Sequence, residues 1–450
     1  MFRELSISEI KEKFQNKELN PIDIAKECIS RYEKLDPTYK SWVCFDKDVL
    51  LTEAKNSNKK IVDGKPLRSL EGIPIGVKDI FNTADYPTQM GSPLWKGFTP
   101  GNDARVVYNL KNAGGVIAGK TVTAEFAVHA LNETQNPHDC ALTPGTSSSG
   151  SAVAVSLGMV PVSIGTQTAG SIVRPASFCG VYGCKPSFGL IPRTASLKTT
   201  DSLDTIGFFT AHSEDLKTVF DVCRVHGPNF PISYQALKDM DRQVKPNARP
   251  WKVAFVKTHT WEQAPEYAKQ ALNDFVNRAS NFSNIEIFDV ELPSDMERCH
   301  AVHETIYSKS LSYYFSDEYK KNELVSPVMN HLIEAGLDIA VQDYHDALTN
   351  QNKLINIMDQ FLQEYDIMIS LSTLGEAPLR EKEELPDPAL MWTLTHLPVV
   401  SAPVFTSPDN KPFGLQISAR KYNDILLFRF IDYLRSVNLI PQGCHPKPEL

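Results

Sequence analysis

The feature that most constrains this chain is the segment 142–189, in which serine, threonine and glycine recur throughout. It reads LTPGTSSSGSAVAVSLGMVPVSIGTQTAGSIVRPASFCGVYGCKPSFG. Glycine permits positive φ angles and close approach of the backbone to a ligand, while serine and threonine favour turns and helix caps. An ordinary hydrophobic core does not need this composition. We therefore interpret the segment as part of an active site around which the rest of the chain is organised.

Helical and strand patterns alternate on both sides of this segment. Apolar positions at helical spacing predict helices over 6–16, 21–35, 103–113, 213–226, 266–279 and 423–437, with shorter ones after Ser148 or Ser149 and near Ser171. Apolar, β-branched runs predict buried strands over 72–81, 114–120, 160–166, 251–257, 285–292, 365–372 and 397–405. Residues 293–365 are mostly helical in pattern and rich in aromatics, which suggests a cover over one side. No repeat or low-complexity linker divides the 450 residues, so we expect one continuous α/β domain.

Composition excludes several classes of protein. The formal net charge of −8 and the lack of a dense basic cluster argue against a nucleic-acid partner. The eight cysteines form no CxxC pair, which argues against a metal framework and a disulfide scaffold. No signal-peptide run and no apolar segment of membrane-spanning length occur, so we expect a soluble cytoplasmic protein with no membrane partner.

The serines need a base before they can act as nucleophiles. His129 and His138 precede the segment, but neither has a companion carboxylate in a G-x-S-x-G context. A lysine can serve instead when burial disfavours its charged form and lowers its pKa. Lys78 follows the apolar run GIPIGV and is the best-placed candidate.

The same stretches resemble the amidase signature family. That family carries a GGSSGGS-type loop followed by a D-T-G-G-S-type turn, and this chain has GTSSSGS at 145–151 and QTAGS at 167–171. GIPIGVKD at 72–79 matches the family's lysine segment. The similarity continues through 109–127, 178–193, 373–379, 392–404 and 412–420, and is weakest over 225–365. The resemblance implies one amidase signature domain over 1–450, a mixed, twisted β-sheet covered by helices on both faces. It would have a catalytic region at about 72–210 and a substrate-pocket cover at about 293–365.

The resemblance also implies a Ser-Ser-Lys triad. Carried over by position, Ser171 is the nucleophile, Ser147 the bridging serine and Lys78 the general base. Ser147 precedes Ser171 by 24 positions, the spacing of these serines in the family. The bridging serine typically follows a cis peptide bond, which would be Thr146–Ser147 here. The backbone N–H groups of Thr168, Ala169, Gly170 and Ser171 would form the oxyanion hole.

Three positions depart from the family pattern. Gln167 stands where many relatives have aspartate, and Ala169 stands where they have glycine. Arg174 follows the nucleophile by three positions, whereas many relatives have the arginine two positions on. We expect a Gln167 hydrogen bond to replace an Asp–Arg pair, with Arg174 directed elsewhere as a structural or substrate-contacting residue. The backbone donors survive an alanine, so the catalytic machinery should be intact.

Two other patterns have less specific interpretations. GGVIAGKT at 114–121 satisfies the phosphate-loop pattern G-x-x-x-x-G-K-[ST], but that loop must lie between a strand and a helix, and here GGVIAG itself has the pattern of a strand. Cys299, His300 and His303 lie close together, yet no metal-ligand spacing completes a site, so solvated or pocket-lining side chains are favoured. Ser148 or Ser149 is expected to cap the helix that follows.

The sequence thus predicts an amidohydrolase that cleaves linear carboxamide C–N bonds through an acyl-enzyme, with a small-molecule amide as substrate. No metal or organic cofactor is implied, and a homodimer is a reasonable prior. The alternatives are a glutaminase-type subunit of a tRNA-dependent amidotransferase and a hydrolase of a urea or carbamate such as allophanate. The first lacks support at 136–140, where the chain has NPHDC instead of the N-P-W-N run expected in such a glutaminase.

Overall fold

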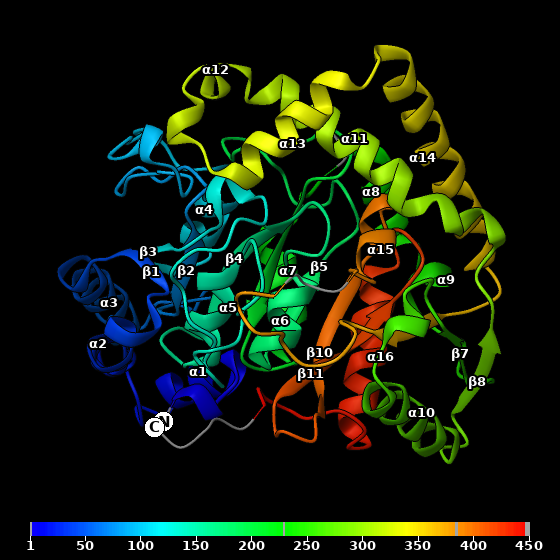
Figure 1. Cartoon of the computed structure of the whole chain (residues 1–450). Coiled ribbons are helices and arrows are strands. Elements are labelled where there is room, and N and C mark those ends of the chain that lie inside the picture. The colour runs from blue at the N-terminus through cyan, green and yellow to red at the C-terminus, as the bar shows by residue number, and fades with distance from the viewer. Residues whose placement is uncertain (1, 228–229, 383–385, 446–450) are drawn as a thin grey trace.

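A mixed sheet of eleven strands runs through the computed structural model, which describes residues 2–227, 230–382 and 386–445 (Figure 1). The strand order is β1-β3-β2-β4-β6-β5-β10-β11-β9-β7-β8. Strands pair in parallel around β2 and around β7, and antiparallel elsewhere. The strands are β1 Trp42–Phe45, β2 Pro74–Lys78, β3 Val116–Thr121, β4 Val162–Gln167, β5 Tyr182–Lys185, β6 Thr205–Thr210, β7 Trp251–Val256, β8 Ile285–Val290, β9 Ile367–Leu371, β10 Val399–Thr406 and β11 Pro412–Ser418.

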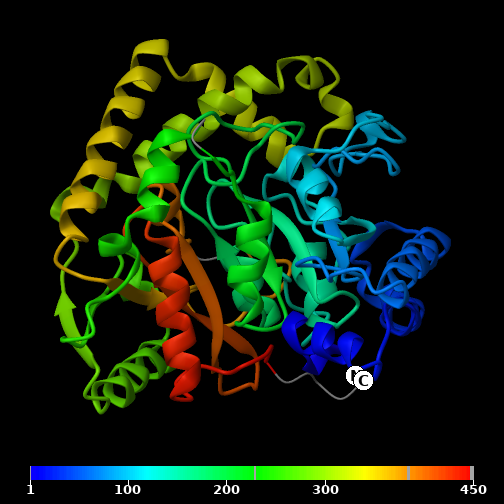
Figure 2. The same ribbon diagram turned by 180° about the vertical axis from the view of Figure 1, so that it is seen from behind.

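Helices cover both faces of this sheet, and the expected α/β class is confirmed. Figure 1 shows α5 and α6 in front of the sheet, and Figure 2, from behind, shows α16 over the opposite face. The helices are α1 Ile7–Gln15, α2 Pro21–Tyr39, α3 Lys47–Val62, α4 Arg105–Asn112, α5 Ser149–Ser156, α6 Val173–Cys179, α7 Asp215–Cys223, α8 Pro231–Lys238, α9 Met240–Gln243, α10 Glu266–Ser280, α11 Cys299–Tyr314, α12 Ser316–Tyr319, α13 Pro327–Asp338, α14 Val341–Phe361, α15 Leu390–Leu394 and α16 Asp424–Ser436. Within the described ranges, none of them is both long and apolar enough to span a bilayer.

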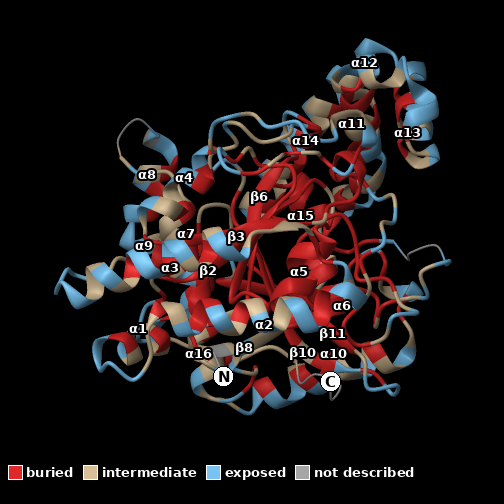
Figure 3. Ribbon diagram, turned by 90° about the vertical axis from the view of Figure 1, so that its left-hand side faces the viewer, coloured by how far each residue is buried: buried red, intermediate tan, exposed pale blue. Residues whose placement is uncertain are grey.

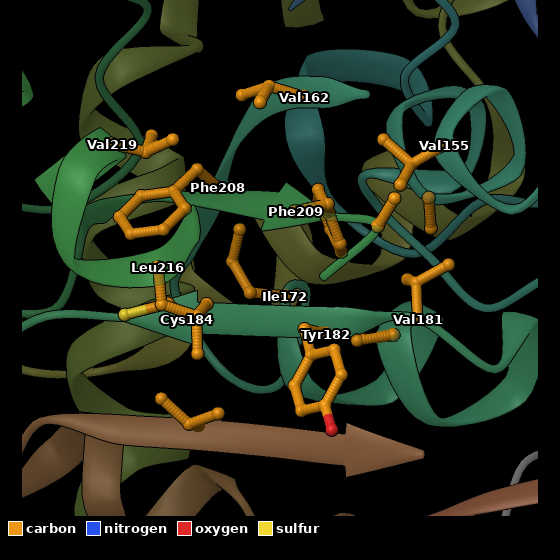
Figure 4. Close-up of a cluster of buried hydrophobic side chains, with 14 of the residues drawn as sticks. Val155, Val162, Ile172, Val181, Tyr182, Cys184, Phe208, Phe209, Leu216 and Val219 are labelled. Atoms are coloured by element: carbon orange, nitrogen blue, oxygen red, sulfur yellow. The ribbon is translucent and has the colours of Figure 1, made fainter. Parts of the chain in front are cut away.

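The serine- and glycine-rich segment lies at the centre of the molecule. Every residue of α5 is buried, in keeping with small or apolar side chains on all sides of that helix (Figure 3). Beside it, strands β4, β5 and β6 and helix α7 contribute to a packed apolar cluster that includes Val162, Ile172, Phe208 and Phe209 (Figure 4). The segment is therefore held in place by the main core.

Most predicted elements are present, with corrections at several boundaries. The helix predicted over 21–35 begins at Pro21, as expected, but continues to Tyr39. The mostly helical interval 293–365 forms α11 to α14, which lie together across one end of the sheet (Figure 1). Ser148 occupies the N-cap position of α5, yet its side chain does not cap the helix and turns toward β4 instead. The sequence patterns do not predict α3, β1, β5, β6 or β11.

The phosphate-loop pattern at 114–121 forms a strand, as the sequence indicated. Its lysine, Lys120, is fully buried on β3 and lies 3.0 Å from the Asp79 carboxylate. The ammonium also donates to the carbonyl oxygen of Pro87 and the hydroxyl of Thr88. Lys120 is thus part of an internal ion pair.

Replacing Lys120 by methionine is expected to lower the free energy of unfolding by about 3–5 kcal/mol, because it leaves the Asp79 carboxylate buried without its cation. Urea unfolding would measure the loss. A matched double variant, Lys120→Met with Asp79→Leu, should recover much of it. A single variant as stable as the parent would contradict this assignment.

Candidate active site

The parallel pairing of β2 with β4 brings two predicted site segments together at one edge of the sheet. Val77 pairs with Ile164, so the last residue of β2, Lys78, lies beside the end of β4. Lys78 Nζ lies 3.0 Å from Thr166 Oγ1, within hydrogen-bond distance across the two strand ends. Thr166 was not among the predicted site residues, although its place one residue before Gln167 follows from the strand register.

The serine loop supplies the other two contacts of the amine. Lys78 Nζ lies 2.8 Å from Ser147 Oγ and 2.9 Å from Ser148 Oγ. The Ser148 hydroxyl donates to the carbonyl oxygen of Thr166, so it must accept from the lysine. The peptide bond Thr146–Ser147 is cis, which confirms that prediction. Lys78 and Ser147 are therefore in direct contact.

Burial sets the charge state of Lys78. Its side chain is fully buried, and desolvation holds the pKa of the amine well below the usual value for lysine. The more distant carboxylate of Asp204 acts in the opposite direction, with a smaller effect. Among the described residues, no carboxylate forms an ion pair with Lys78. The arrangement favours a neutral amine that has a free lone pair.

Two other lysines are equally buried but are placed differently. Lys120 has the Asp79 carboxylate beside it, which counteracts the lowering of its pKa by burial. Burial lowers the pKa of Lys185 to about 7, and its amine donates to the carbonyl oxygens of Pro186 and Leu397. Carbonyl oxygens have no proton to give, so neither contact offers Lys185 a hydroxyl to deprotonate. Lys78 is the buried lysine whose partners are hydroxyl groups.

Ser171 follows β4 in the turn 168–171. Its residue is 9% exposed, and among the described residues no hydrogen bond joins its hydroxyl to that of Ser147. The structure therefore shows the Lys78–Ser147 contact and leaves the Ser147–Ser171 step as a prediction. Hydrogen bonds between catalytic groups are often long before substrate binds, so this geometry is compatible with the predicted relay.

Gln167 replaces the expected aspartate by bridging β4 and α6. Its side-chain oxygen accepts from the backbone N–H groups of Ile172 and Val173, at 2.8 and 2.9 Å. Its amide nitrogen donates to Thr393 Oγ1 at 2.9 Å. The predicted Gln167 hydrogen bond is thus present, and it holds the turn from both ends.

Arg174 is directed away from Gln167, as expected, and forms a hydrogen-bonded ion pair with Asp387. Both side chains are largely buried and line a small cavity that also includes Phe178 and Glu376. A Cβ atom at Gly170 would clash with the Asp387 carboxylate, so this position of the turn requires glycine. Asp387 was not predicted, because its neighbourhood in the sequence carries no recognisable motif.

The backbone donors of the turn are available. Within the part of the chain that the structure describes, the N–H groups of Ala169, Gly170 and Ser171 donate to no protein acceptor. Thr168 is anchored through its hydroxyl, which donates to Asp204 Oδ1 at 2.9 Å. Free N–H groups on a tightly held turn are the donor set that an oxyanion requires.

His303, expected to be solvated or pocket-lining, is instead buried against this turn. The residue is 4% exposed, and its Nε2 lies 2.9 Å from the carbonyl oxygen of Thr168. Burial lowers the pKa of its imidazole to about 4. The sequence signal was the helical spacing that places His303 on the inner side of α11.

Buried histidines also make stability depend on pH. His138 donates to the Cys179 carbonyl, and burial lowers the pKa of its imidazole to about 4. Because the unfolded state then binds more protons between about pH 4 and 6.5, His138 contributes stability that is lost as pH falls. The free energy of unfolding of His138→Gln, relative to the parent, should therefore rise by about 2 kcal/mol from pH 7 to pH 5. Urea unfolding at both pH values would test this, and a constant difference would contradict it.

Comparisons with known proteins agree with this geometry. The family model described as Amidase matches residues 23–428. A glutamyl-tRNA(Gln) amidotransferase protein of Staphylococcus haemolyticus is 28% identical over 468 residues, 94% of this chain and 95% of that protein. A solved structure described as "An unexpected vestigial protein complex reveals the evolutionary origins of an s-triazine catabolic enzyme" is 25% identical, with a TM-score of 0.87 and coverage of 98% of this chain and 100% of that one.

Peptide amidase from Stenotrophomonas maltophilia shares the fold, with a TM-score of 0.81 at 21% identity over 99% of both chains. The family match spans most of the sequence, including every predicted site residue. The chain therefore belongs to the amidase signature family of amidohydrolases.

Proposed function

We propose that this protein hydrolyses linear carboxamides through a Ser-Ser-Lys relay and an acyl-enzyme. The observation that supports this most directly is the contact between Ser147 and Lys78, a fully buried amine that forms no ion pair among the described residues. Because Ser148 accepts from one N–H of Lys78, the lone pair of the neutral amine is free to face Ser147. Lys78 can thus remove a proton from Ser147 without first losing one of its own.

The relay then generates the nucleophile. Ser147 gives its proton to Lys78 and takes the proton of Ser171 as Ser171 Oγ attacks the amide carbonyl. The carbonyl oxygen becomes an oxyanion that the N–H groups of Thr168, Ala169, Gly170 and Ser171 stabilise. The proton returns through Ser147 to the leaving nitrogen as the C–N bond breaks, which releases ammonia or an amine. Water then attacks the ester and releases the carboxylic acid. These steps require no metal or organic cofactor.

A hydrolysis screen tests the proposal. Purified protein would be incubated with primary carboxamides, anilides, glutamine, urea and allophanate, and the release of ammonia or amine would be measured. The description of one structural relative as connected with an s-triazine catabolic enzyme makes the urea-type arm relevant. We expect turnover of at least one carboxamide and labelling of Ser171 by a fluorophosphonate. A protein that is folded yet neither labelled nor active on any of these substrates would contradict the proposal.

A second candidate is a glutaminase-type subunit of a tRNA-dependent amidotransferase, favoured by the names of the curated relatives. The chain departs from the expected run at 136–140, where Asn136 and His138 instead make buried hydrogen bonds to backbone carbonyls. Purification of the protein from its own host as a tight heteromer with glutaminase activity would support this candidate. A free protein that hydrolyses simple amides would rule it out.

A further inference from the structure

Three successive carbonyl groups of the turn 168–170 are each held by a hydrogen bond from outside the turn. His303 Nε2 lies 2.9 Å from the oxygen of Thr168, and Thr393 Oγ1 lies 2.6 Å from the oxygen of Ala169. The backbone N–H of Arg174 donates to the oxygen of Gly170 at 2.8 Å. The last bond belongs to the start of α6, but the first two come from side chains on separate helices, α11 and α15.

In a trans peptide unit, the C=O group and the following N–H point in opposite directions. A hydrogen bond that fixes the Thr168 carbonyl therefore also fixes the N–H of Ala169, and one that fixes the Ala169 carbonyl fixes the N–H of Gly170. We propose that His303 and Thr393 are positioning residues of the oxyanion hole, which aim these two N–H groups at the developing oxyanion. This inference rests on the proposed amidase function and goes beyond the Ser-Ser-Lys relay.

The chemistry of His303 suits this role. A carbonyl oxygen only accepts, so Nε2 carries the proton and Nδ1 does not, in the neutral ring that burial enforces. The proton on Nε2 is committed to Thr168, so His303 acts through the backbone and is not a proton carrier. Since His303 lies on α11, the bond also fastens the helical cover to the catalytic turn.

Thr393 is equally constrained. Its hydroxyl accepts from the Gln167 amide, so its single proton is left for the Ala169 carbonyl at 2.6 Å. The carbonyl of Ala389 lies 3.5 Å away, too far to compete for that proton. Gln167, Thr393 and the turn thus form one chain of hydrogen bonds from β4 to α15.

Paired variants separate the loss of the donor from the loss of packing. His303→Phe and Thr393→Val remove the donor but keep much of the volume, while His303→Gln and Thr393→Ser keep a donor. The measurements would be the rate of fluorophosphonate labelling of Ser171 and the kinetics on the best amide from the screen. We expect kcat and the labelling rate to fall about 10- to 100-fold in the first pair, with KM within about threefold, because small misplacement of a catalytic group has this cost. The second pair should stay within about fivefold of the parent.

His212→Phe is the matched control. His212 is also buried and donates to a backbone carbonyl, that of Arg3, beyond the end of β6 remote from the turn. We expect a similar fall in Tm but unchanged kcat. Equal losses in His303→Phe and His303→Gln, or parent rates in both donor-less variants, would overturn the inference.

Crystal structures of the four variants give a test that does not depend on activity. The peptide planes after Thr168 and Ala169 should rotate in His303→Phe and Thr393→Val, respectively, and keep their orientation in the conservative variants. Unchanged planes in both donor-less variants would overturn the positioning role even if the amidase proposal holds. Rotated planes in a protein whose parent is not labelled at Ser171 would support the positioning of the turn and count against the amidase function.

Discussion

Replacing Ser171 by alanine is expected to lower kcat for amide hydrolysis by at least about 10⁴-fold, because the variant has no hydroxyl to form the acyl-enzyme. The protein should remain folded, since the Ser171 hydroxyl makes no hydrogen bond with the described residues and the side chain is small. Ammonia release on the best primary amide would measure kcat, and thermal unfolding would measure stability. Labelling by a fluorophosphonate should disappear in parallel.

The control for this variant is Ser156→Ala, another buried serine of the same segment. Ser156 lies at the end of α5, where its hydroxyl donates to the Cys179 carbonyl at 2.8 Å. Its loss should cost about 1 kcal/mol of stability and leave kcat within twofold. Ser171→Ala turnover within tenfold of the parent, or labelling that persists, would show that another group is the nucleophile.

Much of the fold was predictable because its central elements have strong local patterns. Continuous apolar runs identified β2, β3, β4, β7 and β10, each buried along most of its length. The strands without a prediction carry weaker signals. For example, β5 has four residues and contains Gly183, and β1 is a four-residue edge strand. Helix α3 is mostly polar because only Leu50, Ala54 and Ser57 of its sixteen residues are buried.

The site was predictable where its residues belong to motifs and unpredictable where they act across the chain. Lys78, Ser147 and Gln167 lie in the quoted segments, and the structure brings the first two into contact. His303 and Thr393 lie 135 and 224 positions from the backbone groups they bind. Such contacts depend on how the cover helices pack, which local periodicity does not determine. The family resemblance likewise contained no position for Asp387.

Replacing Lys78 by methionine is the second change with a large expected effect. Methionine fills a similar apolar volume but cannot take the proton of Ser147, so kcat should fall by about 10³- to 10⁵-fold. In the parent, the relay works only with the neutral amine. The rate should therefore fall about tenfold per pH unit once the pH drops below the lowered pKa of Lys78. The residual rate of the variant should lack this acid limb, which pH profiles of kcat/KM would show.

Stability should respond to the same substitution with a defined sign. Unfolded Lys78 holds its proton up to its ordinary pKa, whereas the folded amine has lost it at much lower pH, so the unfolded state binds more protons between the two values. The parent should therefore gain stability from Lys78 as pH rises through this window, and Lys78→Met should lose that slope. Lys120→Met, which removes the amine paired with Asp79, should be the less stable variant but keep the acid limb of activity. An acid limb that persists in Lys78→Met would mean that a group other than this amine accepts the proton from the serine relay.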